Sequence, residues 1–155
     1  MNGQPQWAGL LEFRVTNMGV TEPTPQAIRP FTIIPVNQPF RLNSGFEIGG
    51  WLGEGLNNLQ VGGNSILEYN VTYFTERIGA GGGIQRSPAA IPCQPMNYTY
   101  GSPDTDLVVP ANTLLPGTHR LTCVVKMSPA GGGSAGFPWH VTGFVEGPMI
   151  EIYQP

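Results

Sequence analysis

The sequence predicts an all-β fold, an antiparallel β-sandwich of about seven to nine strands, and three observations support this prediction. Residues after His119 alternate between two faces, one of which carries Leu121, Cys123, Val125 and Met127. A period of two indicates a strand with one buried face. The 22 Gly and 16 Pro residues lie between apolar runs and indicate many turns. No segment has a convincing helical pattern, since the nearest candidate, 55–61, is short and flanked by Gly.

The expected strands follow one another at short spacing, and apolar residues alternate along most of them. Pro35 confines the second strand to a sheet edge or ends it, and residues 43–45 interrupt the third as a bulge or a turn. The expected strands are 10–16, 31–36, 40–52, 66–78, 96–100, 106–109, 119–127 and 139–153, the last with a break at Gly147-Pro148. The side chains expected in the core are Phe13, Ile48, Leu67, Val71, Leu121 and Val125.

The length of 155 residues is that of a single domain of ordinary size. Residues 1–30 are interpreted as an N-terminal strand and a Pro-rich extended arm, and residues 31–155 as the β-sandwich. The two segments together are expected to form one domain.

The charge content is low, because only 11 % of the residues are charged. Two interpretations remain open: an uncharged polar surface, or a surface largely covered by other subunits, since interface cores are depleted in charge. Seven Lys and Arg residues and a net charge of −3 cannot form a basic patch for phosphate, so we expect no nucleic-acid partner. We also expect no membrane span and no signal peptide, and thus a cytoplasmic protein or part of an assembled particle.

The segment from Leu114 to Val125 reads Leu-Leu-Pro-Gly-Thr-His-Arg-Leu-Thr-Cys-Val-Val. It resembles the penultimate strand of immunoglobulin-like and fibronectin-type-III-like domains. His119 stands where these families commonly have Tyr, and an imidazole N–H can partly replace the hydrogen bond of that tyrosine. The resemblance implies an immunoglobulin-like sandwich over residues 31–153, a fold that hosts many unrelated functions.

The reactive side chains are few and do not form a recognisable constellation, so we expect no enzyme, metal or cofactor. Cys93 and Cys123 are either a disulfide or two free thiols, of which Cys123 is a small buried apolar residue. His119 and His140 lack metal-ligand spacing with them. Asp104 and Asp106 lie on a turn, where Asp caps backbone groups, and a calcium site formed by this pair lacks further oxygen ligands nearby in the sequence.

The aromatic residues are the best candidates for an interaction surface. Trp51 is expected in the core, whereas the loop aromatics either anchor a partner protein or stack against sugar rings. The interaction candidates are Trp7, Tyr98, Tyr100, Phe137 and Trp139.

The leading functional hypothesis is a non-enzymatic structural or interaction subunit of a larger assembly, such as a filament, shell or appendage. Its partners would be further copies of the chain or other protein subunits. The alternative hypothesis is a carbohydrate- or small-ligand-binding module that uses exposed Trp139, Tyr98 and Tyr100.

Overall fold

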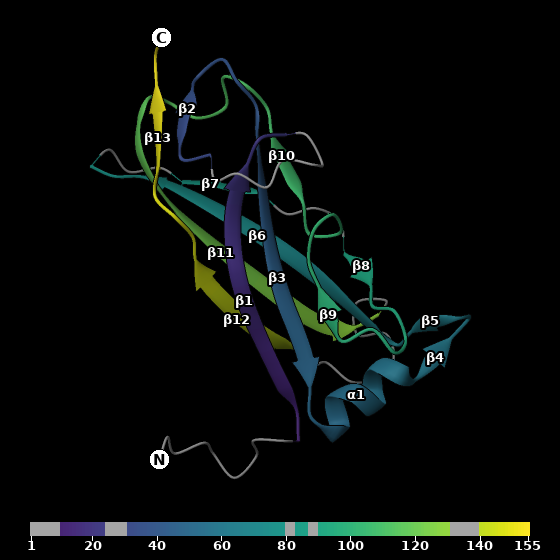
Figure 1. The fold of residues 1–155 in the computed structure, drawn as a ribbon. Helices are drawn as coiled ribbons and strands as arrows, with labels where there is room; N and C mark the ends of the chain where they lie inside the picture. The colour runs from purple at the N-terminus through teal and green to yellow at the C-terminus, as the bar shows by residue number, and fades with distance from the viewer. Residues whose placement is uncertain (1–9, 24–30, 80–82, 87–89, 131–139) are drawn as a thin grey trace, which may run out of the picture.

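The computed structural model describes residues 10–23, 31–79, 83–86, 90–130 and 140–155, and these residues form thirteen strands and one helix (Figure 1). The prediction of an all-β fold is therefore confirmed. Nine of the described strands have three or more residues, and the other four have two. The described strands form two large sheets and a small hairpin of β4 (Gln60–Val61) and β5 (Asn64–Ser65).

The first sheet is built around β3 (Phe40–Gly49), which pairs antiparallel with β1 (Glu12–Thr21) on one side. On its other side β3 pairs with β9 (Thr99–Tyr100) and β10 (Leu107–Val109). The interruption expected at 43–45 does not break β3. Instead, β1 shifts register between Val15 and Asn17, opposite Gly45, so the bulge lies in the partner strand.

The second sheet has the order β2 (Ile33–Pro35), β13 (Ile150–Tyr153), β11 (Gly117–Pro129), β6 (Leu67–Arg77) and β7 (Gly83–Arg86). Two further strands belong to it: β12 (Val141–Glu146) pairs with β11, and β8 (Ile91–Pro92) pairs with β6. The pairing is antiparallel in both large sheets, as predicted, except between β2 and β13, which are parallel.

The two sheets share one hydrophobic core, and β1 and β3 cross in front of β6 and β11 in Figure 1. Phe46 of the first sheet meets Tyr69 of the second edge to face, with ring centroids 4.9 Å apart. Five of the six predicted core side chains are buried, and Phe13 is half-buried at the margin of the core. This arrangement is compatible with a β-sandwich.

The helix α1 (Trp51–Asn58) corrects the prediction that the chain has no helix and that Trp51 lies in the core. The chain turns at Gly50, whose φ of 76° favours glycine, and enters the helix with Trp51 70 % exposed. The buried side chain of Asn57 donates hydrogen bonds to Gln94 O and Asn97 O at 3.0 and 2.8 Å. These contacts come from residues about forty positions away, so the local sequence pattern could not reveal them.

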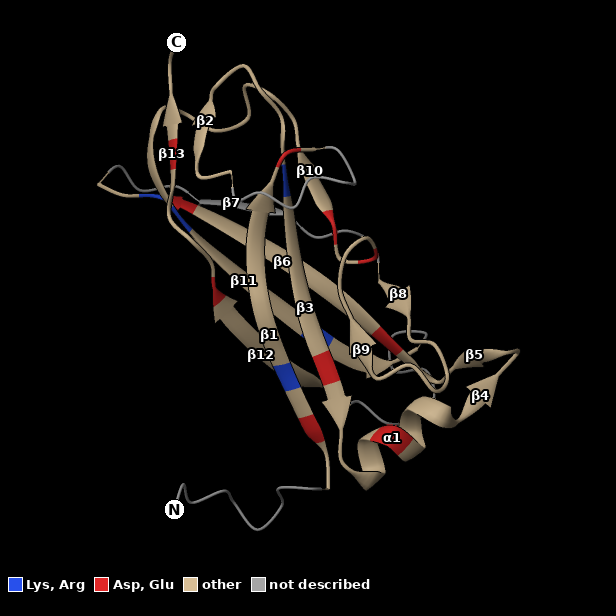
Figure 2. Cartoon of the chain, in the orientation of Figure 1, with Lys and Arg blue, Asp and Glu red and all other residues tan. Residues whose placement is uncertain are grey.

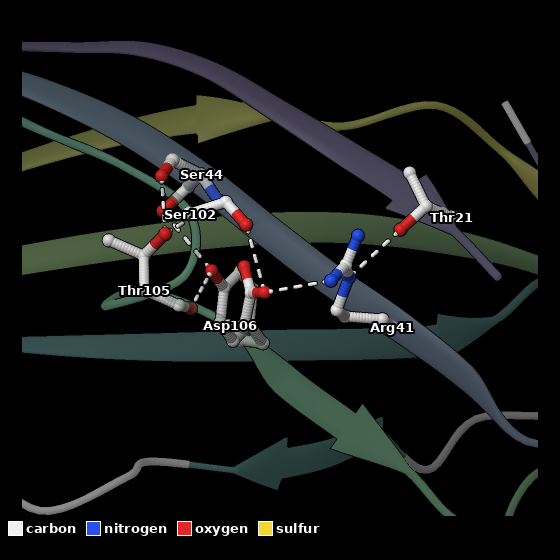
Figure 3. Close-up of polar contacts among 7 residues, drawn as sticks. Thr21, Arg41, Ser44, Ser102, Thr105 and Asp106 are labelled. Carbon is white, nitrogen blue, oxygen red and sulfur yellow. Dashed lines mark hydrogen bonds and ion pairs between the residues drawn. The ribbon is translucent and has the colours of Figure 1, made fainter. Parts of the chain in front are cut away.

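A buried polar network joins the first sheet to the residues that precede β10 (Figure 3). Arg41 Nη1 lies 3.1 Å from Asp106 Oδ2, and Arg41 Nε donates to Thr21 Oγ1 at 3.1 Å. Ser102 Oγ donates to the same carboxylate oxygen at 2.9 Å. The ion pair is almost fully buried, which is tolerated because further hydrogen bonds accompany it.

The same network continues to the second sheet. Thr105 Oγ1 donates to Ser44 O at 2.6 Å, and Tyr73 OH of β6 donates to Thr105 O at 2.6 Å. Burial raises the pKa of Tyr73 above its ordinary value, so the phenol remains a donor at neutral pH. The residues between β9 and β10 are thereby tied to both sheets.

His119 is buried at the start of β11, and its Nε2 lies 2.8 Å from Leu115 O. A carbonyl oxygen only accepts hydrogen bonds, so Nε2 carries the proton of this bond. The imidazole thus reaches back to the backbone four residues upstream.

The core assignment predicts the effect of truncating Leu121. Leu121→Ala should lower the free energy of unfolding by about 2–5 kcal/mol, because the side chain has no exposed surface and its removal leaves a cavity. The measurement is chemical denaturation followed by tryptophan fluorescence. Arg120→Ala, next to it on the exposed face, serves as the control and should change stability by less than about 0.5 kcal/mol. Equal effects of the two changes would contradict the assigned faces of β11.

Candidate functional site

Two of the five predicted interaction residues lie in the described part of the chain. Trp7, Phe137 and Trp139 lie outside the described residues. The prediction that loop aromatics at 137 and 139 anchor a partner therefore stays a prediction. Tyr100 is buried and stacks on Phe46, with centroids 4.8 Å apart and planes 8° apart. Its ring is therefore a core side chain and is not available to stack on a sugar.

Tyr98 lies at the surface, but its hydroxyl belongs to a local hydrogen-bond network. Asn58 Nδ2, at the end of α1, donates to Tyr98 OH at 2.8 Å. Asn58 Oδ1 accepts from the backbone N–H of Met96 at 2.8 Å. Tyr98 and Tyr100 thus do not form one platform, since one binds the helix and the other faces the core.

The disulfide between Cys93 and Cys123 does not form in this structure, where both thiols are free and buried. Cys93 N–H donates to Leu67 O, whereas Cys123 is paired with Tyr73. Tyr73 follows Leu67 by six residues of β6, so the two cysteines are about 20 Å apart along the strand. A disulfide needs Cα atoms within about 7 Å.

The carboxylate of Asp106 is engaged by Arg41, so it acts in the polar network rather than as a cation ligand. Across the described residues, no group of three or more His, Cys, Asp or Glu side chains is placed to hold a metal ion. Within the same residues, no helix has the length and apolar character needed to cross a membrane.

The most distinctive surface feature is an apolar strip on the exposed face of the second sheet, formed by Phe144, Val124 and Phe74. Phe144 of β12 is paired with Val124 of β11, and Phe74 of β6 is paired with Thr122, the next outward residue of β11. Directly opposed residues lie on the same face, and diagonal neighbours are about 7–8 Å apart. Phe144 is 72 % exposed, while Val124 and Phe74 are partly exposed. We call these three residues the outer strip.

Charged residues flank the outer strip and do not interrupt it. On β11, Arg120 and Lys126 lie on either side of Thr122 and Val124, and the acidic residues of β6 lie towards its two ends (Figure 2). The flanking charged residues of this face are Arg120 and Lys126 of β11, Glu68 and Glu76 of β6, and Glu146 of β12. An apolar centre with aromatic side chains and a charged rim is the composition of a protein interface.

The strand that carries Phe144 is also an unprotected edge of the sheet. β12 is paired with β11 on one side, and no described strand pairs with its other side. Its residues from Val141 to Val145 contain no charge, no proline and no bulge. Proteins usually protect an edge with one of these devices, as β1 does here with Glu12, Arg14 and its bulge.

The inner face of β12 lies close to the first sheet. A Cβ added to Gly143 would lie 2.8 Å from Val15 Cγ2 and 3.0 Å from Phe13 Cε1, both side chains of β1. A larger residue at this position would therefore require the side chains of Val15 and Phe13 to move. The close approach holds β12 in place and directs Phe144 away from the core.

No family model matches the sequence of this chain, and no curated protein is significantly similar to it. The candidate site therefore depends on its own geometry.

The sequence contains a partial signal for the outer strip. The alternation in β11 places Val124 among polar residues on the outward face. The alternation in β12 places Phe144 on the outward face and Val141 and Val145 on the inward face. Apolar residues at outward positions are informative when several strands bring them together, and strand pairing is known only from the structure.

The burial of the two thiols predicts low reactivity in the native protein. Desolvation raises the pKa of Cys93 and of Cys123 to about 11, and the thiolate is the reactive form. At pH 8 a thiol reagent should label both residues at least about tenfold more slowly in the folded protein than in denaturant. Labelling is followed by absorbance and mass spectrometry. Rapid modification of either residue without denaturant would contradict its burial.

Proposed function

We propose that this protein is a non-enzymatic structural subunit of a larger protein assembly, and that it associates through the outer strip and the adjoining edge of β12. The observation that carries the proposal is Phe144, a large aromatic side chain that is 72 % exposed at the edge-strand end of the outer strip. Covering a phenylalanine side chain is favourable by about 1.5–3 kcal/mol, which makes such a residue an effective anchor for a partner.

The proposal includes an immunoglobulin-like arrangement of the strands. In immunoglobulin domains the first, second, fourth and fifth strands form one sheet, and the third, sixth and seventh form the other. The division of β1, β3, β9 and β10 from β6, β11 and β12 supports this arrangement, while β9 pairs with β3 and the second sheet also contains β2, β7, β8 and β13. Domains of this kind act through their surfaces and loops, so the fold is suited to the role without defining it.

The alternative of a carbohydrate-binding module has weaker support. Tyr100 is buried against Phe46, and Tyr98 is bonded to Asn58, so neither offers an open ring face paired with the other. We therefore favour a protein partner over a sugar.

Phe144→Ser tests the proposed function. The change should weaken association at least about tenfold, because it removes the apolar anchor from the outer strip. It should leave the thermal unfolding temperature nearly unchanged, since the side chain is exposed. Sedimentation and light scattering measure the particle size of the purified protein, and capture from the native source measures association with other subunits.

Val61→Ser is the matched control, because Val61 is 75 % exposed but lies on the β4–β5 hairpin away from the outer strip. Association should be unaffected by this change. A wild-type protein that remained a monomer at high concentration and captured no partner would refute the proposed function.

A further inference from the structure

We propose that the partner of the β12 edge is a second copy of this chain, paired antiparallel about a two-fold axis that passes between the two Phe144 residues. The second sheets of the two copies would then form one continuous sheet. This inference rests on the proposed function, which it deepens by naming the partner and the register of the contact.

The backbone hydrogen bonds of β12 determine which residues face the free edge. Gly147 N–H donates to Leu121 O at 3.0 Å, which identifies these two residues as a hydrogen-bonded pair. Hydrogen-bonded and non-hydrogen-bonded pairs alternate along antiparallel strands. Val141, Gly143 and Val145 therefore bond to β11, while the N–H and C=O groups of the alternate residues, Thr142, Phe144 and Glu146, point to the free edge.

The faces of the strand then select the register. If a two-fold axis places Phe144 opposite its own copy, Thr142 lies opposite Glu146 of the second copy. Every backbone N–H and C=O group of these three residues then faces a partner on the other copy. Each of the three pairs exchanges two backbone hydrogen bonds, about six in all. A shift of one residue would place Phe144 opposite the inward-facing Gly143 of the other copy. The outer face of one copy would then lie on the same side as the inner face of the other.

The side chains support the same register. The outer strip becomes continuous across the axis, because Val124 and Phe144 of one copy meet Phe144 and Val124 of the other. Lys126 is paired with Thr142, and Thr142 lies beside Glu146 of the second copy, so the two long charged side chains meet over a small threonine. Neither Lys126 nor Glu146 forms an ion pair with any residue that the structure describes.

The other described edges are less suited to such pairing. β1 is charged and bulged, β2 contains Pro35, and β8 contains Pro92. These features remove a backbone donor or distort the edge. β7 contains Arg86, and β9 and β10 are only two and three residues long. Compared with these edges, β12 offers five successive uncharged residues and carries the exposed aromatic side chain of Phe144.

A cysteine pair tests the register while keeping Phe144. Thr142→Cys and Glu146→Cys chains, one carrying a size tag, are mixed and oxidised. Opposed residues of a hydrogen-bonded pair have Cα atoms about 5.5 Å apart, within the range of a disulfide. The mixture should therefore form a tagged–untagged disulfide dimer as its main product.

Each cysteine variant alone is its own control, because two copies of either position lie roughly 13 Å apart along the strands and cannot be bridged. The native cysteines are buried and should not contribute. Equal cross-linking in the mixture and in the single variants, or none in the mixture, would overturn the two-fold pairing. If the mixture failed while Phe144→Ser still abolished association, the proposed function would stand with a different partner.

A proline tests the backbone contribution. Thr142→Pro removes an N–H that no residue described by the structure accepts but that pairing between the copies requires, and edge positions tolerate proline. The dissociation constant of the dimer, measured by sedimentation, should rise at least about tenfold. The thermal unfolding temperature of the monomer should be nearly unchanged. Thr142→Val keeps the N–H and should preserve the dimer. Equal dissociation constants for the two variants would show that strand pairing is not the contact.

Discussion

The structure depends on the pairing of β6 with β11, the longest strand pair in the described chain. Their eleven paired residues, from His119 with Arg77 to Pro129 with Leu67, hold two rows of side chains in register. The inward row is buried on both strands except at Arg77, which is partly buried, and the first sheet packs against this row. Because side chains alternate strictly in a strand, this one register also decides which residues face outward.

The first sheet is held against the β6–β11 pair by both apolar and polar contacts. Phe46 lies between Tyr69 and Tyr100, and the network of Arg41, Asp106 and Thr105 reaches Tyr73 on the opposite sheet. A buried ion pair contributes little net stability compared with apolar side chains of the same size, but removing one partner leaves an uncompensated charge. The network therefore fixes the position of the residues between β9 and β10 relative to both sheets.

The same alternation that fills the core gives β12 its candidate role. Gly143 and Val145 face inward, and Gly143 allows the strand to lie against β1, so Phe144 is directed to solvent. Its exposure leaves apolar surface uncovered beside free backbone groups at a sheet edge. The addition of another strand would cover the apolar surface and satisfy the backbone groups at the same time. For this reason we connect the proposed assembly role with the pairing of two copies.

The sequence alone determined the all-β class, the inward faces of β6 and β11, and most of the core, because a period of two is a local property. It did not determine α1, since Asn57 is held by Gln94 and Asn97, and it placed Trp51 in the core for lack of those contacts. The separation of Cys93 from Cys123 and the burial of Tyr100 also depend on which strands are neighbours. The outer strip was decided only by the tertiary structure, because Phe144, Val124 and Phe74 come from three strands that the chain brings together over seventy residues.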